Sequence, residues 1–101
     1  MTFYEMLQET GLKVEYGFIP DDEPAIPPFL IYLFDDLDTF KADNRIYDKY
    51  DNYRIEYYFT KKDLSIEAKI ESLLEENGYI YEKSGDTWID SEKLYVIYYY
   101  C

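Results

Sequence analysis

Phe29-Leu30-Ile31-Tyr32-Leu33-Phe34 is the stretch that decides the fold of this chain. It is a continuous run of apolar and aromatic residues, bounded by Pro27-Pro28 on one side and by Asp35-Asp36 on the other. Its length and composition are typical of a β-strand that is covered on both faces. We therefore place the centre of a β-sheet at this run.

A second strand is expected upstream of this run. Val14, Tyr16 and Phe18 alternate with polar residues and glycine, which is the period-two pattern of a strand with one buried face. All four prolines of the chain lie between Pro20 and Pro28. Because proline lacks a backbone donor, this segment is expected to be an exposed loop that links the two strands.

Further strands are expected downstream. Residues 45–50 and 53–60 have the pattern of two aromatic strands, and Asp51-Asn52 between them suits a tight hairpin turn. Neither side of 45–50 is purely apolar, so this strand is expected near an edge or an interface. Short strands are predicted near the end of the chain at 79–83, 87–89 and 93–100.

Two helices complete the set. Thr2 and Glu5 have the spacing of a capping box that starts a short helix near Phe3, and Gly11 suits a left-handed residue after it. The second helix follows Asp63, a suitable N-cap, and closes at Gly78. Its apolar residues recur at helical spacing and its acids are expected to point mostly outward. The apolar stripe consists of Ile66, Ile70, Leu73 and Leu74, and the acids are Glu67, Glu71, Glu75 and Glu76.

The order of these elements predicts an α+β fold. We expect a mixed, mostly antiparallel β-sheet packed against one long amphipathic helix and a short N-terminal helix. The 101 residues suit one domain, 1–101, with a single core.

Charge limits the function. Twenty-two acidic residues against ten basic ones give a net charge of −12, which repels phosphate backbones and anionic lipid headgroups. We therefore expect no direct nucleic-acid binding and no membrane partner. No apolar stretch approaches the roughly 20 residues that span a bilayer, so the chain is expected to be soluble and cytosolic when it is made.

Catalytic groups are scarce. The chain has no histidine, and its serines lack the context of an activated nucleophile. The acids at Asp35, Asp36 and Asp38 lack the ligand spacing of an EF-hand, and we expect a solvated loop there. Cys101, the only cysteine, is expected to be an incidental and frayed terminal residue. We predict no enzyme activity, no cofactor and no metal.

The 14 tyrosines suggest many positions at core edges or subunit interfaces. Trp88, Tyr95, Tyr98 and Tyr100 could form a stacking platform, but ordinary sheet packing explains them better, with some exposed tyrosines in subunit contacts. The candidate binding surfaces are an acidic loop from Asp35 to Asn44 and an aromatic edge. Their residues are Asp35, Asp36, Asp38, Phe40 and Asp43 on the loop, and Tyr47 and Tyr50 on the edge.

Several local motifs carry a resemblance to a known group. The motifs are Thr10-Gly11-Leu12, Tyr16-Gly17, Pro27-Pro28-Phe29, Ala42-Asp43-Asn44, Tyr53-Arg54-Ile55-Glu56, Thr60-Lys61-Lys62-Asp63, Glu67-Ala68-Lys69 and Tyr81-Glu82-Lys83. With this order of elements, the chain resembles the small neck proteins of long-tailed bacteriophages and of prophages of Gram-positive hosts. Within them, it is most similar to the tail-completion or tail-terminator group.

The resemblance implies a structural protein of the virion that waits in the host cytoplasm before assembly. It implies a ring, most simply a hexamer, that stops growth of the tail tube and joins the tube protein to the head-tail connector. The acids of the loop are then expected to face the lumen or the next ring, where they would keep DNA sliding. A head-tail connector or a minor structural protein of the same gene neighbourhood would show much the same features.

A second class of function also fits the charge. An acidic inhibitor can mimic DNA and occupy the basic groove of a nuclease or repressor. The acids here are scattered without regular spacing, and the tyrosine-rich strands are better explained by assembly. Ionic strength distinguishes the two, since mimicry weakens steeply with salt while an aromatic contact persists.

Overall fold

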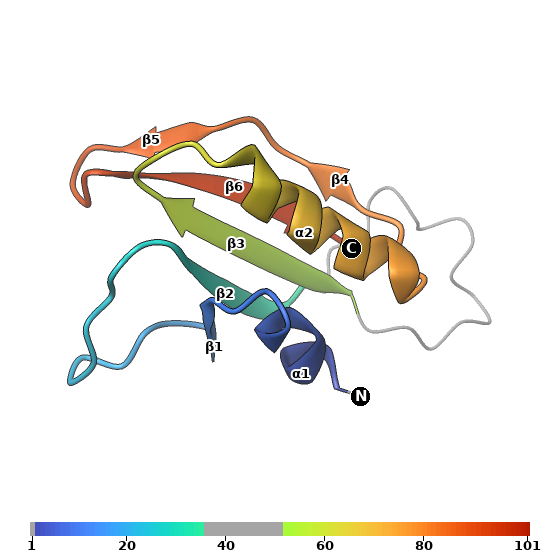
Figure 1. Ribbon diagram of the computed structural model, residues 1–101. Coiled ribbons are helices and arrows are strands. Elements are labelled where there is room, and N and C mark those ends of the chain that lie inside the picture. The colour runs from blue at the N-terminus through green and yellow to red at the C-terminus, as the bar shows by residue number, and fades with distance from the viewer. Residues whose placement is uncertain (1, 36–51) are drawn as a thin grey trace.

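The computed structural model describes residues 2–35 and 52–101. These residues form an α+β fold with two helices and a mixed sheet of six strands (Figure 1). The elements are α1 (Phe3–Gln8), β1 (Lys13–Tyr16), β2 (Phe29–Phe34), β3 (Tyr53–Phe59), α2 (Leu64–Glu76), β4 (Glu82–Lys83), β5 (Thr87–Ile89) and β6 (Leu94–Tyr100).

The strand order is β1-β2-β3-β6-β4, and β5 also pairs with β6. β1 is parallel to β2, and every other pairing is antiparallel. The prediction that Phe29–Phe34 is a strand is confirmed, but its placement at the centre of the sheet is wrong, because β3 lies there. The apolar run correctly indicates burial on both faces at its start, where Phe29 and Leu30 are buried, but Phe34 at its end is 57% exposed. An apolar run therefore does not show which place a strand takes in the sheet.

The hairpin predicted around Asp51-Asn52 is also wrong in its pairing. β3 uses one edge for β2, from Tyr53 to Tyr58, and the other for β6, from Arg54 to Phe59. A third strand has no edge of β3 left to pair with. The predicted strand 45–50 itself lies outside the described residues.

The first strand is shorter than its alternation suggests. β1 ends at Tyr16, because Gly17 has a positive φ of 81° and turns the chain out of the sheet. Val14 is buried as expected, whereas Tyr16 and Phe18 are 49% and 69% exposed. The buried face predicted for all three residues therefore exists at Val14 alone.

Local signals place both helices. The Thr2 hydroxyl accepts a hydrogen bond from the Glu5 amide at 3.1 Å, and the Glu5 carboxylate accepts one from the Thr2 amide at 2.8 Å, which confirms the capping box of α1. Asp63 caps α2 by accepting from the Ser65 amide, and Gly78 follows the helix with a φ of 83°. The second helix is present as predicted, although it has only 13 residues.

The sheet has two unlike faces. Both helices pack on one of them, which we call the helix face, and we call the other the open face (Figure 1). The helix face holds the main core: Phe3, Met6, Leu7, Val14, Leu30, Ile55, Tyr57, Phe59, Ile70, Leu73, Leu74, Ile97, Tyr99 and Cys101. The open face has a smaller apolar cluster, in which Phe29, Ile31 and Leu94 are buried against the partly buried Ile19, Tyr58 and Ile89.

Cys101 belongs to this core. It is 2% exposed, and it exchanges two backbone hydrogen bonds of 2.9 Å with Tyr53. The expected fraying of the last residue is therefore wrong, because pairing with the start of β3 extends the β3–β6 ladder to the end of the chain.

Candidate assembly surfaces

Of the binding candidates from the sequence, Asp35 alone lies in the described residues. Asp36, Asp38, Phe40, Asp43, Tyr47 and Tyr50 lie outside them. The Asp35 amide donates a hydrogen bond to the Asn52 carbonyl at 2.8 Å, directly beyond the paired Phe34 and Tyr53. Asp35 and Asn52 therefore lie side by side at one end of the β2–β3 pair.

Exposed aromatic side chains gather at the β1 side of the helix face. Tyr16 and Tyr32 are partners in the β1–β2 register, and their ring centroids are 5.1 Å apart. Tyr16 also contacts Phe34, and Tyr32 contacts Tyr4 of α1. We call these four residues the aromatic corner. Tyr4, Tyr16 and Phe34 are 39%, 49% and 57% exposed, so the corner offers apolar area at the surface.

The opposite edge of the sheet carries another exposed aromatic residue. Trp88 of β5 is 48% exposed, and its ring packs edge-on against Tyr95 of β6 at 4.9 Å. The indole nitrogen donates to Asp90 at 3.3 Å. The sheet therefore presents a half-exposed aromatic residue at each of its two edges.

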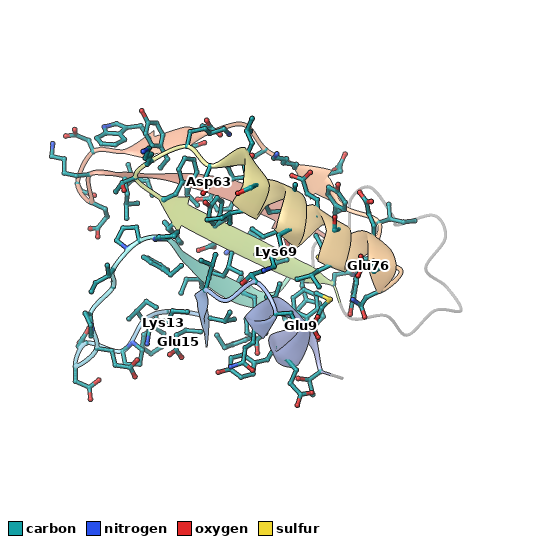
Figure 2. The ribbon with its side chains drawn as sticks, viewed as in Figure 1. Glu9, Lys13, Glu15, Asp63, Lys69 and Glu76 are labelled. Carbon is teal, nitrogen blue, oxygen red and sulfur yellow. The ribbon has the colours of Figure 1, made fainter. Side chains whose placement is uncertain are left out.

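The charged residues of β1 lie on the other face of that strand. The Lys13 ammonium lies 3.5 Å from the Glu15 carboxylate, its neighbour in Figure 2, and it also pairs with Glu23 of the loop before β2. These two partners hold the lysine against its own chain. The exposed Tyr16 thus lies on one face of β1 and the paired charges on the other.

Polar residues of β3 form a ladder on the open face. Arg54 contacts the Glu56 carboxylate at 3.0 Å, and Glu56 accepts a hydrogen bond from the Tyr58 hydroxyl at 2.7 Å. Burial raises the pKa of Tyr58, and the bond to Glu56 raises it further, so the phenol stays neutral and donating. Tyr58 also stacks on Phe29 at 5.0 Å. Side chains of β2 and β3 therefore cover this part of the open face.

A buried carboxylate lies between α2 and the sheet. Glu67 is 2% exposed, and its two oxygens lie 2.7 Å from the Lys62 ammonium and 2.8 Å from that of Lys83. Lys83 also pairs with Glu71 at 2.8 Å, and Glu71 accepts from the Tyr99 hydroxyl at 2.9 Å. We call these five residues the carboxylate–lysine cluster.

The expectation that Glu67 points outward is therefore wrong. A signal was present in the sequence, because Glu67 precedes Ile70 by three residues and Leu74 by seven, which places it on the apolar stripe. Its cationic partners come from outside the helix, one before α2 and one on β4. They satisfy the charge that such a position would otherwise leave buried and unpaired.

The pKa values of Lys83 and Tyr57 favour a structural role for this region. Burial alone would lower the pKa of Lys83, but hydrogen bonds to Glu67 and Glu71 outweigh it and raise the pKa. Burial, with the charges of Glu67 and Asp63, raises the pKa of the nearby Tyr57 to about 12. Both groups keep their protons near neutral pH, so Lys83 remains a cation that pairs with Glu67 and Glu71 of α2.

Residues 2–35 and 52–101 contain neither a metal-binding cluster nor a membrane-spanning helix. No three acidic or cysteine side chains there come together in a way that could hold a metal ion. No helix in this part of the chain is long and apolar enough to cross a membrane. The surfaces that stand out in the described residues are the aromatic corner and the edge at Trp88.

Comparisons with protein-family models, with curated proteins and with solved structures find no match to this chain.

Proposed function

We propose that the chain is a structural subunit of a bacteriophage neck, of the tail-completion or tail-terminator kind. It assembles into a ring, most simply a hexamer, which ends the tail tube and offers a docking face to the head-tail connector. It acts by binding alone, without enzymatic chemistry or a cofactor. Its place of action is the virion, after a period in the host cytoplasm.

The observation that supports this proposal is that both edges of the sheet carry exposed aromatic residues, in a chain whose net charge is −12. Tyr16, Phe34 and Trp88 are each about half exposed. Aromatic residues are enriched at protein interfaces, where they combine a large apolar area with a polar tip. The negative charge disfavours nucleic acid as the partner, so protein surfaces are the better candidates.

The acidic residues have a role in this proposal. Asp35, Asp36, Asp38 and Asp43 face the lumen of the ring or the next ring, where their charge prevents the DNA backbone from sticking. The described residues that flank positions 36–51 support this role, since Asp35 and Asn52 lie side by side at one end of the β2–β3 pair. Tyr47 and Tyr50 are proposed to contact a neighbouring protein.

An acidic inhibitor that mimics DNA is the alternative function. The net charge of −12 favours it. The structure offers an argument against it: Glu56, Glu67 and Glu71 are paired with arginine or lysine within the chain. A mimic needs unpaired carboxylates at its surface, and those three acids are unavailable for that purpose.

The mass of the purified protein, measured by light scattering, tests the proposal. It is measured alone and with the tail-tube protein of the same phage, at low and at high salt. A ring that resists salt, or one that forms only with the tube protein, supports the neck function. A monomer that ignores the tube protein but binds a basic host protein at low salt supports the mimic.

A further inference from the structure

Resting on the ring proposed above, we infer that neighbouring subunits continue one β-sheet. The β5 edge of one copy pairs with the β1 edge of the next. In the described residues, β1 has a strand partner on one side only, β2, and β5 has one on one side only, β6 (Figure 1). The occupant of each edge is thus a second copy of this chain.

Strand directions favour this contact. β1 runs parallel to β2, β3 runs opposite to both, β6 runs with them, and β5 runs opposite again. A rotation about an axis along the strands keeps every direction, so β5 of one copy meets β1 of the next in antiparallel orientation. Such a contact joins two different edges, and repeated rotation closes it into a ring.

The faces of the two edges also match. Tyr16 lies on the helix face, since it contacts Tyr32 and follows the buried Val14 by two residues. Trp88 lies on the same face, because it is the register partner of Tyr95, which packs against the main core. The same rotation keeps the helix face on one side of the ring. It therefore brings Trp88 of one copy to the face that carries Tyr16 of the next, and both lose their exposure of about one half.

Charge near the edges does not oppose the contact. Lys13 is paired with Glu15 and Glu23, and Lys93 after β5 is paired with Asp90 at 3.0 Å. The strand β5 itself, from Thr87 to Ile89, contains no charged residue. Each copy nevertheless carries a net charge of −12, so whole copies repel one another. Association should become stronger as salt screens this repulsion.

The single tryptophan reports on the contact directly. Sedimentation and fluorescence are measured together on the intact chain, up to about 1 mM protein, where a contact of about −4 kcal/mol is half formed. The series extends to about 1 M NaCl, where the screening length is about 3 Å. We expect the emission of Trp88 to shift to the blue and its quenching by acrylamide to fall as the mass rises. A chain that stays monomeric throughout, or one that associates with unchanged Trp88 emission, overturns the inference.

Two edge variants distinguish this β5–β1 contact from a symmetrical contact between two identical edges. Tyr16→Lys blocks the β1 edge and Trp88→Lys blocks the β5 edge. Leu64→Lys, at a position that is 69% exposed at the start of α2, is the control for the added charge. Each lysine lowers the repulsion between copies, so loss of association has to come from the edge. We expect both edge variants to be monomers at a concentration where the control still assembles.

Mixing the two edge variants is the sharpest test. Tyr16→Lys keeps a good β5 edge and Trp88→Lys keeps a good β1 edge, so the mixture should form a one-to-one pair that grows no further. If Trp88→Lys alone still dimerises, or if the mixture stays monomeric, the head-to-tail contact is refuted. If both edge variants still form rings on the tube protein, the contact is refuted but the proposed neck function is retained. If the wild-type chain does not bind the tube protein, the proposed function itself is contradicted.

Discussion

The helix face and the open face belong to the same sheet, yet they are stabilised in different ways. On the helix face, two helices bury a large apolar core together with a charged carboxylate that two lysines neutralise. On the open face, a smaller apolar cluster is bordered by the Arg54, Glu56 and Tyr58 ladder. More apolar side chains are buried on the helix face than on the open face, so we expect more of the stability to come from the helix face.

Truncating one leucine on each face should show the largest difference. Leu73 of α2 is 7% exposed, whereas Leu33 of β2 alternates to the open face and is only partly buried. Leu73→Ala should lower the free energy of unfolding by about 2–5 kcal/mol, and Leu33→Ala by less than about 1.5 kcal/mol. Urea denaturation measures both values. Equal losses would remove the distinction between the faces.

The next largest difference is expected between replacing a lysine of the carboxylate–lysine cluster and replacing one outside it. Lys83→Met leaves Glu67 buried with Lys62 as its remaining partner and Glu71 without its lysine, so we expect a loss of about 2–3 kcal/mol. Lys93→Met is the matched control, because Lys93 pairs with Asp90 at a site where both side chains are more than two thirds exposed. That change should stay within about 0.5 kcal/mol. A Lys83 variant as stable as the control would mean that the cluster does not hold α2.

Much of the helix face was predictable, because its signals are local. The capping box at Thr2, the cap at Asp63 and the stripe of Ile70, Leu73 and Leu74 each depend on residues within one or two helical turns. The buried Glu67 was not predicted, because one of its two lysines comes from β4, sixteen residues further along the chain. Its spacing of three residues from Ile70 and seven from Leu74 was the available hint.

The sheet order was harder to predict for the same reason. An apolar run such as Phe29–Phe34 indicates a strand but not its neighbours, and β3 became central through pairing with β6, about forty residues away. For the candidate site, composition pointed to aromatic contacts, but the sequence could not show that Tyr16 and Trp88 stand at opposite edges. That requires the four strand pairings that lead from β1 through β2, β3 and β6 to β5.

Alkaline pH should weaken the helix face through Tyr57. Burial raises the pKa of this phenol from 10.0 to about 12, so the folded state holds the proton more tightly than the unfolded chain. Its contribution is complete below pH 10 and is lost as the pH rises from about 10 to about 12, by on the order of 2 kcal/mol. Thermal unfolding across this range measures the loss. Tyr58 and Tyr99, whose pKa values are also raised by burial, add to the same alkaline loss. Stability of Tyr57→Phe should therefore fall less steeply with pH but still fall, and a slope identical to that of the unchanged chain would show that Tyr57 does not contribute.

The smallest expected difference in stability is between the phenylalanine variants of two buried tyrosines of the helix face at neutral pH. The Tyr99 hydroxyl donates to Glu71 at 2.9 Å, whereas the Tyr57 hydroxyl has no hydrogen-bond partner among the described residues. Tyr99→Phe should cost about 1–2 kcal/mol, since it removes a bond to a charged acceptor. Tyr57→Phe should be neutral or stabilising, because it removes a donor that is buried without a partner. Each variant loses one oxygen atom from a side chain of 0% exposure, so the two serve as controls for each other in a single urea titration series. A larger loss for Tyr57→Phe than for Tyr99→Phe would mean that the Tyr57 hydroxyl is satisfied, most simply by a buried water molecule beside Glu67.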